Sequence, residues 1–115
     1  MIYQGSCHCG QIAFEAEGEL TQVADCNCSI CTQMGALHWF MPRDSLRLLT
    51  PESNLATYTF GSQTIRHHFC PKCGIHPFGE GTDPAGNHKA AVNARCLTGV
   101  DPSSLEVTHL DGRSR

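Results

Sequence analysis

An all-β fold is predicted by two features of the 115-residue sequence. Short strand-like runs alternate with turn residues along the whole chain. No segment shows a long helical period of hydrophobic residues. The length is typical of one domain with a single hydrophobic core. We therefore expect a single domain over residues 1–115, built from short antiparallel strands without an internal repeat or a linker.

The expected strands follow one another along residues 2–7, 11–17, 22–26, 36–42, 46–50, 56–60, 64–70, 75–79, 88–96 and 105–110. Residues 29–34 and 51–54 each predict one short helical turn. Turns are expected at Gly18 and at residues 61–62, 79–81, 83–86 and 101–102, because glycine, proline, aspartate and serine favour chain reversal.

The charge pattern argues against a nucleic-acid partner. The formal net charge is −3, and the eight lysines and arginines are scattered rather than gathered in a basic stripe. No apolar run approaches the roughly 18 residues that a membrane helix needs. Residues 1–7 have neither the basic stretch nor the apolar segment of a signal peptide. The sequence thus predicts a cytoplasmic protein that has no membrane partner.

The eight cysteines point to metal binding. Disulfides are rare in a reducing compartment, where clustered cysteines more often hold a metal ion. A disulfide scaffold is the alternative if a signal sequence has been removed from the chain. The cysteines form three groups and a single residue, namely Cys7 with Cys9, Cys26 with Cys28 and Cys31, Cys70 with Cys73, and Cys96.

Cys70-Pro71-Lys72-Cys73-Gly74 has the form of a zinc knuckle. Two thiolates separated by two residues can curl around one cation, and Gly74 lets the backbone turn so that amides face the sulfurs. A redox pair of the same spacing is the alternative, but it requires a helix that starts at the motif. Gly74-Ile75-His76-Pro77 follows here, which is poor helix material and favours the metal.

Cys7 and Cys9 are two residues apart and would point to one face of a strand. Two thiolates leave zinc half-coordinated, and Cys70 with Cys73 leave it equally incomplete. The simplest solution joins both pairs into one tetrahedral site. A closed site of four sulfurs is structural, because no position remains for a substrate.

Cys26, Cys28 and Cys31 provide three thiolates close together in the sequence. Three protein ligands with one open position are typical of a catalytic zinc. The alternative is a closed site whose fourth ligand is Cys96 or, after it, a histidine among His38, His67 and His68. An iron–sulfur cluster on four thiolates is a third interpretation.

Further considerations limit three of these fourth-ligand candidates. Cys96 is equally compatible with a free thiol in the core. His67 and His68 are adjacent on an expected strand and point to opposite faces, so at most one of them faces the metal.

Taken together, the three cysteine groups resemble the glutathione-dependent formaldehyde-activating enzyme family, which also includes centromere protein V. The resemblance covers most of the chain. It is carried by Gly5-Ser6-Cys7-His8-Cys9-Gly10, Cys26-Asn27-Cys28-Ser29-Ile30-Cys31, Phe69-Cys70-Pro71-Lys72-Cys73-Gly74 and Val92-Asn93-Ala94-Arg95-Cys96-Leu97.

The resemblance implies a β-tent fold of small antiparallel sheets stapled by zinc. It implies two zinc ions per chain, the first structural and the second, with three ligands, not necessarily fully occupied. The first matches Cys7, Cys9, Cys70 and Cys73, and the second, where glutathione chemistry is expected, matches Cys26, Cys28 and Cys31.

The implied activity is that of a carbon–sulfur lyase of the S-hydroxymethylglutathione synthase type. Such an enzyme adds glutathione, or another small thiol, to formaldehyde or a related carbonyl. No general base is identifiable in the sequence, so the catalytic residues stay unassigned. The alternative function is a zinc-stabilised binding module without catalysis, or a carrier of thiol adducts.

Overall fold

Two β-sheets form the framework of the chain in the computed structural model, which describes residues 1–61 and 63–112. Ser62, in one of the expected turns, lies outside the described residues. The strands are β1 (Ile2–Ser6), β2 (Ala13–Glu17), β3 (Gln22–Cys26), β4 (His38–Pro42), β5 (Leu46–Leu48), β6 (Ala56–Tyr58), β7 (Ile65–Phe69), β8 (Phe78–Thr82), β9 (His88–Asn93) and β10 (Glu106–Leu110).

The helical segments of the described residues are short. They are the α-helix α1 (Ser29–Met34) and the 3₁₀ turns η1 (Arg43–Ser45), η2 (Glu52–Asn54), η3 (Ala94–Cys96) and η4 (Pro102–Ser104). The sequence predicted α1 and, within one residue, η2. None of the described helices is long and apolar enough to cross a membrane.

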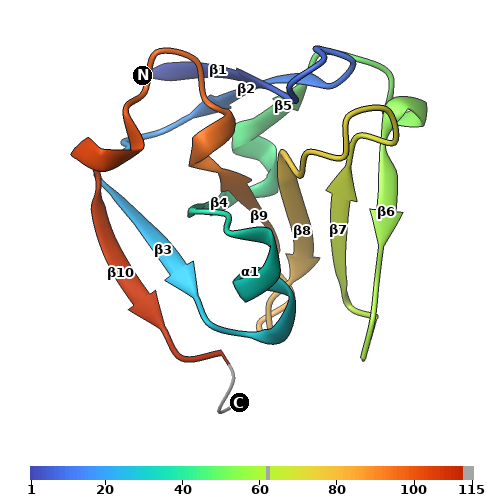
Figure 1. Ribbon diagram of the computed structural model, residues 1–115. Coiled ribbons are helices and arrows are strands. Elements are labelled where there is room, and N and C mark those ends of the chain that lie inside the picture. Colours follow the sequence, from blue (N-terminus) through green and yellow to red (C-terminus); the bar gives the residue numbers. More distant parts are fainter. Residues whose placement is uncertain (62, 113–115) are drawn as a thin grey trace.

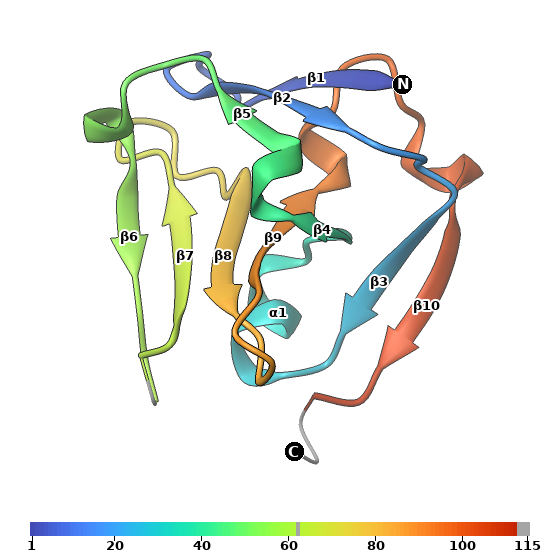
Figure 2. The ribbon, with the colours of Figure 1, turned by 180° about the vertical axis from the view of Figure 1, so that it is seen from behind.

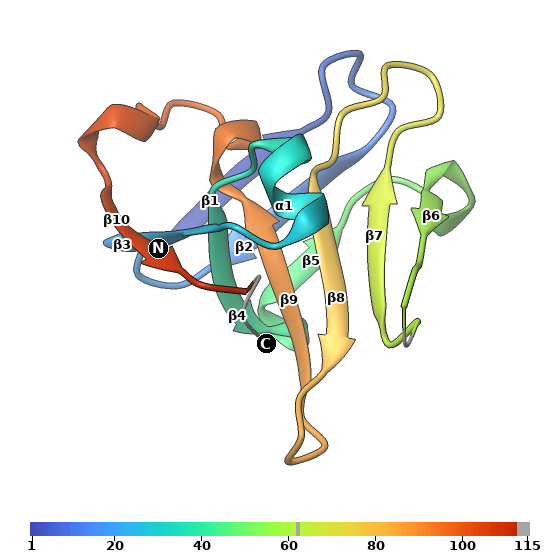
Figure 3. The same cartoon turned by 60° about the horizontal axis from the view of Figure 1, so that its bottom comes forward.

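The two sheets have different sizes and directions. The small sheet has the order β1-β2-β5, and the large sheet has the order β10-β3-β4-β9-β8-β7-β6. Figures 1 and 2 both show β1 and β2 running across one end of the large sheet rather than along its strands. Helix α1 follows β3 directly and is seen in front of β9 in Figure 3.

The main hydrophobic core fills the space between the sheets. Phe14 and Leu46 from the small sheet meet Trp39, Phe78 and Val92 from the large sheet, and all five are buried. Phe14 and Phe78 pack with ring centroids 6.2 Å apart. The mostly β fold of small sheets that the sequence predicted is confirmed.

One pair of strands departs from the antiparallel prediction. β10 runs parallel to β3, with Glu106 beside Gln22 and Leu110 beside Cys26. Parallel neighbours require a long connection, and here residues 27–105 between the two strands provide it. This pairing brings the end of β10 next to the first cysteine of the three-cysteine motif.

The prediction of a turn at residues 79–81 is wrong, because Gly79, Glu80 and Gly81 lie inside β8. A glycine within a strand often marks a close approach of another backbone. A Cβ on Gly79 would lie 3.2 Å from the Arg66 carbonyl oxygen, and one on Gly81 would lie 3.3 Å from that of Thr64. The glycines therefore permit close packing of β8 against β7.

Several other strand boundaries differ from the prediction by one or two residues, and the boundaries of β8 and β9 differ by three. β8 begins at Phe78 rather than at residue 75, because Ile75 closes a loop by accepting a hydrogen bond from the Cys70 N–H at 2.9 Å. β9 ends at Asn93, whose side chain accepts a hydrogen bond from the Arg95 N–H and starts the 3₁₀ turn η3. A side chain that caps its own backbone competes with a strand ladder.

Candidate metal centres

Four cysteine side chains from two distant loops meet at one point. Cys7 and Cys9 follow β1, and Cys70 and Cys73 follow β7. Their sulfur atoms all lie within 4.8 Å of one another. The sulfurs of Cys7 and Cys9 are 3.7 Å apart, and those of Cys9 and Cys70 are 3.6 Å apart. We call these residues the four-cysteine group.

The spacing of these sulfurs suits a tetrahedral zinc ion. Zinc–thiolate bonds of about 2.3 Å place the sulfurs of a tetrahedron about 3.8 Å apart. The Ile12 N–H donates to Cys7 Sγ at 3.3 Å, and the Cys73 N–H donates to Cys70 Sγ at 3.4 Å. Such donors stabilise negative charge on sulfur. The donor set therefore fits a thiolate-bound metal.

The two loops that carry these cysteines share one pattern of backbone hydrogen bonds. The N–H of the first cysteine donates to the carbonyl five residues later, and a glycine N–H donates back to the carbonyl of that cysteine. These distances are 3.0 and 3.2 Å in the loop of Cys7, and 2.9 and 2.7 Å in the loop of Cys70. Gly10 and Gly74 adopt φ of 84° and 80°, in the left-handed region that favours glycine.

This pattern corrects the expectation that Cys7 and Cys9 share one face of a strand. β1 ends at Ser6, and both cysteines lie in the connection between β1 and β2. Their sulfurs approach each other because the chain reverses there. The conclusion that one ion can contact both is unchanged, but its geometric reason is different.

The thiol of Cys73 is prepared for ionisation by its surroundings. The backbone N–H groups of Cys9 and Ile75 point to it and lower its pKa to about 6. A thiolate, rather than a thiol, is the form that binds metal.

The sulfurs of Cys26, Cys28 and Cys31 form a second group, and they also lie within 4.8 Å of one another. Cys26 is the last residue of β3, Cys28 is the N-cap of α1, and Cys31 lies in the first turn of that helix. The direct passage from strand to helix turns the three side chains toward one point. We call these residues the three-cysteine group.

The pKa shifts of two thiols in this group are consistent with a bound cation. Burial opposes ionisation of Cys28, but the N–H groups of Cys31 and Ile30 and the neighbouring thiols outweigh it and lower the pKa of Cys28. Burial raises the pKa of Cys31, and contact with the charge on Cys28 raises it further. A dication among the sulfurs would remove this repulsion. The donor set fits a zinc ion that has three protein ligands.

Within the part of the chain that the structure describes, no histidine, cysteine or acidic side chain joins this group as a fourth ligand. Cys96 Sγ lies instead 3.7 Å from the carbonyl oxygen of His76. Burial, followed by the charges of Cys7 and Cys73, raises the pKa of Cys96 to about 11. These surroundings favour the interpretation of Cys96 as a free thiol in the core.

The two adjacent histidines of β7 make their contacts elsewhere. His68 is buried on the face of β7 that meets Glu80, with its Nε2 2.7 Å from Glu80 Oε2 and its Nδ1 2.9 Å from Thr57 Oγ1. His67 stacks on Phe60 with ring centroids 5.7 Å apart. Their partners differ because neighbouring residues of a strand point to opposite faces.

His38 is the histidine that reaches the three-cysteine group. Its Nε2 lies 3.3 Å from Cys31 Sγ, while its buried Nδ1 has no hydrogen-bond partner. Burial, followed by the charge of His67, lowers the pKa of His38 and keeps the ring neutral at neutral pH. The tautomer that carries its proton on Nε2 can donate to a Cys31 thiolate. Such a donor to a metal-bound ligand tunes the ligand without contacting the metal.

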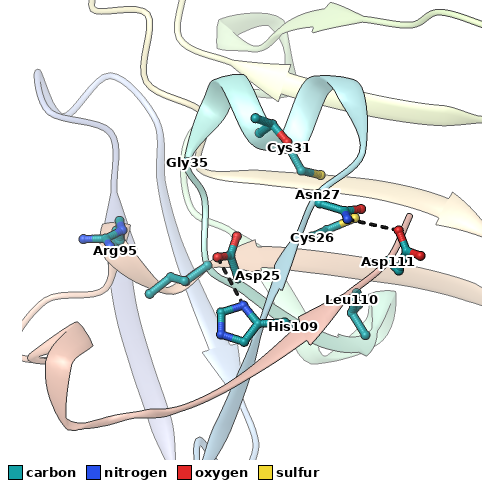
Figure 4. Close-up of a pocket in the computed structure, with 11 residues that line it drawn as sticks. Asp25, Cys26, Asn27, Cys31, Gly35, Arg95, His109, Leu110 and Asp111 are labelled. Carbon is teal, nitrogen blue, oxygen red and sulfur yellow. Dashed lines mark hydrogen bonds and ion pairs between the residues drawn. The ribbon is translucent and has the colours of Figure 1, made fainter. Parts of the chain in front are cut away.

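A cavity of about 590 Å³ borders the three-cysteine group. Figure 4 shows Asn27 Nδ2 donating to Asp111 Oδ1 at 3.0 Å, and the ion pair of Asp25 with His109 at 3.6 Å. Arg95 lies across the cavity from Asn27 in that view. The lining residues are Asp25, Cys26, Asn27, Cys31, Thr32, Gly35, Leu37, Arg95, His109, Leu110 and Asp111.

Gly112 also lies against the three-cysteine group. A Cβ at this position would lie 2.7 Å from Cys26 Sγ and 3.0 Å from the Cys28 Cβ. The chain after β10 therefore passes so close to the sulfurs that only glycine fits without a shift.

Sequence reasoning missed Arg95, Asp25, His109, Asp111 and Gly112 as parts of this site. Asp25 is next to Cys26 in the sequence, and proximity to a cysteine motif is a signal that could have suggested it. Arg95 lies in η3 just after β9, and the others lie in β10 or just after it, so their position depends on strand pairing that no local pattern encodes.

Comparisons with known proteins agree with this architecture. The family model described as "Glutathione-dependent formaldehyde-activating enzyme" matches residues 2–108. A crystal structure of a Rhodobacter sphaeroides protein superposes with a TM-score of 0.79 and is 31% identical in sequence. The alignment covers 91% of this chain and 99% of that one.

Proposed function

The chain belongs to the glutathione-dependent formaldehyde-activating enzyme family, and from this premise we propose that it adds a small thiol to a carbonyl compound. Glutathione is the proposed thiol, and formaldehyde or a close relative is the proposed carbonyl. The product would be an S-hydroxymethyl adduct of the thiol, which is a hemithioacetal. The reaction class would be that of a carbon–sulfur lyase in reverse. The new bond joins sulfur to the carbonyl carbon, and the thiol proton ends on the former carbonyl oxygen.

The proposal assigns two zinc ions to the chain. The four-cysteine group would hold a structural ion, since its four sulfurs already supply a complete tetrahedral shell. The three-cysteine group would hold the ion that serves the reaction. When bound there, zinc keeps a substrate thiol ionised near neutral pH and polarises a carbonyl oxygen.

One observation carries the functional part of the proposal. The three-cysteine group offers three sulfurs, lacks a fourth protein ligand among the described residues and borders a cavity of about 590 Å³. A cavity of this volume is within the usual range for small-molecule sites. A soft sulfur ligand suits such a position, because zinc accepts thiolates readily.

The side chains of the protein would then position the reactants. Cys26, Cys28 and Cys31 would hold the zinc, and the tautomer of His38 with its proton on Nε2 would donate to the Cys31 sulfur. The walls of the cavity confine the thiol and the carbonyl together, which lowers the entropic cost of their meeting. The proposed setting is a reducing, cytoplasmic one, where clustered cysteines hold metal ions more often than they form disulfides.

Calorimetric titration of the zinc-loaded protein with glutathione tests the proposal. We expect saturable binding, which is lost both in Cys28→Ser and with S-methylglutathione, whose sulfur cannot ionise. Formaldehyde is added next, and adduct formation is timed against a protein-free blank. Acceleration supports an enzyme, whereas binding without acceleration supports a carrier. Absence of binding at millimolar glutathione would leave a zinc-stabilised binding module.

A further inference from the structure

The cavity beside the three-cysteine group has an uneven distribution of charge. Two carboxylates line it, and each has a partner, since Asp25 pairs with His109 and Asp111 accepts a hydrogen bond from Asn27. Arg95 is the single lysine or arginine among the lining residues. Within the described residues, its exposed guanidinium has no ion pair or hydrogen bond of its own. The cavity thus presents one unpaired positive charge.

The backbone of Arg95 is held firmly in place. Its N–H donates to the Asn93 side-chain oxygen at 3.1 Å, and that oxygen also accepts from the Leu37 N–H at 3.4 Å. The Asn93 amide nitrogen donates to the His76 carbonyl at 3.0 Å. The neighbouring Ala94 is fully buried and donates its N–H to the Leu37 carbonyl at 2.8 Å. Arg95 therefore lines the cavity from a well-anchored backbone.

The position of Arg95 relative to the sulfurs suggests what it binds. In Figure 4 it lies on the far side of the Asp25–His109 pair from Asn27 and Asp111. A negatively charged group beside Asp25 or Asp111 would be repelled, whereas the same group beside Arg95 would be attracted. Guanidinium matches a carboxylate with two parallel hydrogen bonds. A thiol held at the sulfurs would thus turn its carboxylate toward Arg95.

We infer that Arg95 binds the carboxylate of the thiol substrate, and that the site selects thiols carrying a carboxylate over thiols carrying none. This inference rests on the proposed function, since it presumes that a thiol is held at the three-cysteine group. It adds the recognition element that distinguishes one class of thiol from another. Asp25 sharpens the selection, because its charge disfavours a carboxylate placed elsewhere in the cavity.

Calorimetric titration of the zinc-loaded full chain with a matched pair of ligands tests the inference. The ligands are glutathione and its diethyl ester, which keeps the thiol and masks both carboxylates. We expect glutathione to bind the unaltered protein at least about tenfold more tightly than the ester, a typical effect of a charge-assisted hydrogen bond.

Substitution of the arginine then assigns that preference to a residue. Arg95→Gln should bring the two ligands to within about twofold of each other by weakening glutathione binding alone, and Arg95→Lys should keep part of the preference. Arg47→Gln is the matched control, because Arg47 is an exposed arginine on β5 outside this cavity. It should leave both affinities unchanged.

The outcomes separate the inference from the function on which it rests. If glutathione and the ester bind equally well to the unaltered protein, or if Arg95→Gln keeps the full preference, the carboxylate assignment is wrong and thiol binding stands. If neither ligand binds, the proposed function fails and the inference fails with it. Retained melting temperatures of the Arg95 variants would show that any lost preference is not caused by unfolding.

Discussion

The four-cysteine and three-cysteine groups differ first in how much of the chain they connect. Cys9 and Cys70 are 61 residues apart in the sequence, whereas Cys26, Cys28 and Cys31 all lie within one strand-to-helix connection. A cross-link between distant segments removes more conformational freedom from the unfolded chain than a local one. The same sulfur chemistry is therefore expected to stabilise the fold at one place and contribute little stability at the other.

The groups also differ in what surrounds them. Cys7 and Cys70 are fully buried and form a small hydrophobic cluster with Ile12. The three-cysteine group instead borders a cavity of about 590 Å³. Four sulfur ligands leave no coordination position for a substrate, whereas three ligands beside a cavity leave one. Under the proposed function, ligands that are distant in the sequence hold a structural metal, and ligands that are close together hold the reactive one.

Loss of a ligand from the four-cysteine group should have the largest effect. We expect Cys73→Ser to abolish folding or to lower the melting temperature drastically, because structural zinc sites contribute on the order of 10 kcal/mol. Thermal unfolding by circular dichroism, combined with metal analysis, measures this. Cys96→Ser is the matched control, since this partly buried thiol belongs to neither group. A Cys73→Ser protein with normal stability and full zinc content would contradict the structural role of the four-cysteine group.

Loss of a ligand from the three-cysteine group should change metal content more than stability. Cys28→Ser is expected to lose close to one zinc per chain and keep its circular dichroism spectrum. The reason is that the pairing of β3 with β10 and the helix α1 hold the chain around Cys28, so the fold there does not depend on a long-range cross-link through metal. Wholesale unfolding of this variant would indicate that both metals are structural.

Removal of the hydrogen bond from His38 should have an intermediate effect on the second metal alone. His38→Asn takes the donor away from Cys31 Sγ, and such losses typically cost about 10- to 100-fold in metal affinity. His38→Gln restores an N–H near the position of Nε2 and should recover most of that affinity. The absorption of the cobalt-substituted protein reports the change in the Cys31–metal bond. Equal behaviour of the two variants would argue that His38 only fills space.

A methyl group at Gly112 should produce the smallest effect. In Gly112→Ala the new Cβ would approach Cys26 Sγ, so the end of the chain must shift. Overpacking of this kind costs roughly 1–3 kcal/mol, and we expect about tenfold weaker binding of the second metal at the low end of that range. Competition with a zinc chelator measures it. Unchanged metal affinity would mean that this segment yields freely.

Local patterns in the sequence account for the parts of the molecule that depend on nearby residues. The short helix at residues 29–34 and most strands occur where predicted, because their hydrogen bonds and turn residues lie within a few positions. The grouping of Cys7 and Cys9 with Cys70 and Cys73 followed from counting ligands, and the structure brings these sulfurs together. The sulfurs of Cys7 and Cys9 take part in this group although both residues lie in a turn and not on a strand.

Only the tertiary structure decided which residues share the second site. The parallel pairing of β10 with β3 carries His109, Asp111 and Gly112 to the three-cysteine group. The capped end of β9 brings Arg95 to the other side of the cavity. Such pairings depend on how two sheets fill one core, and a pattern of a few residues does not encode that. By itself the sequence determined where sulfur ligands could gather, and packing decided what faces them.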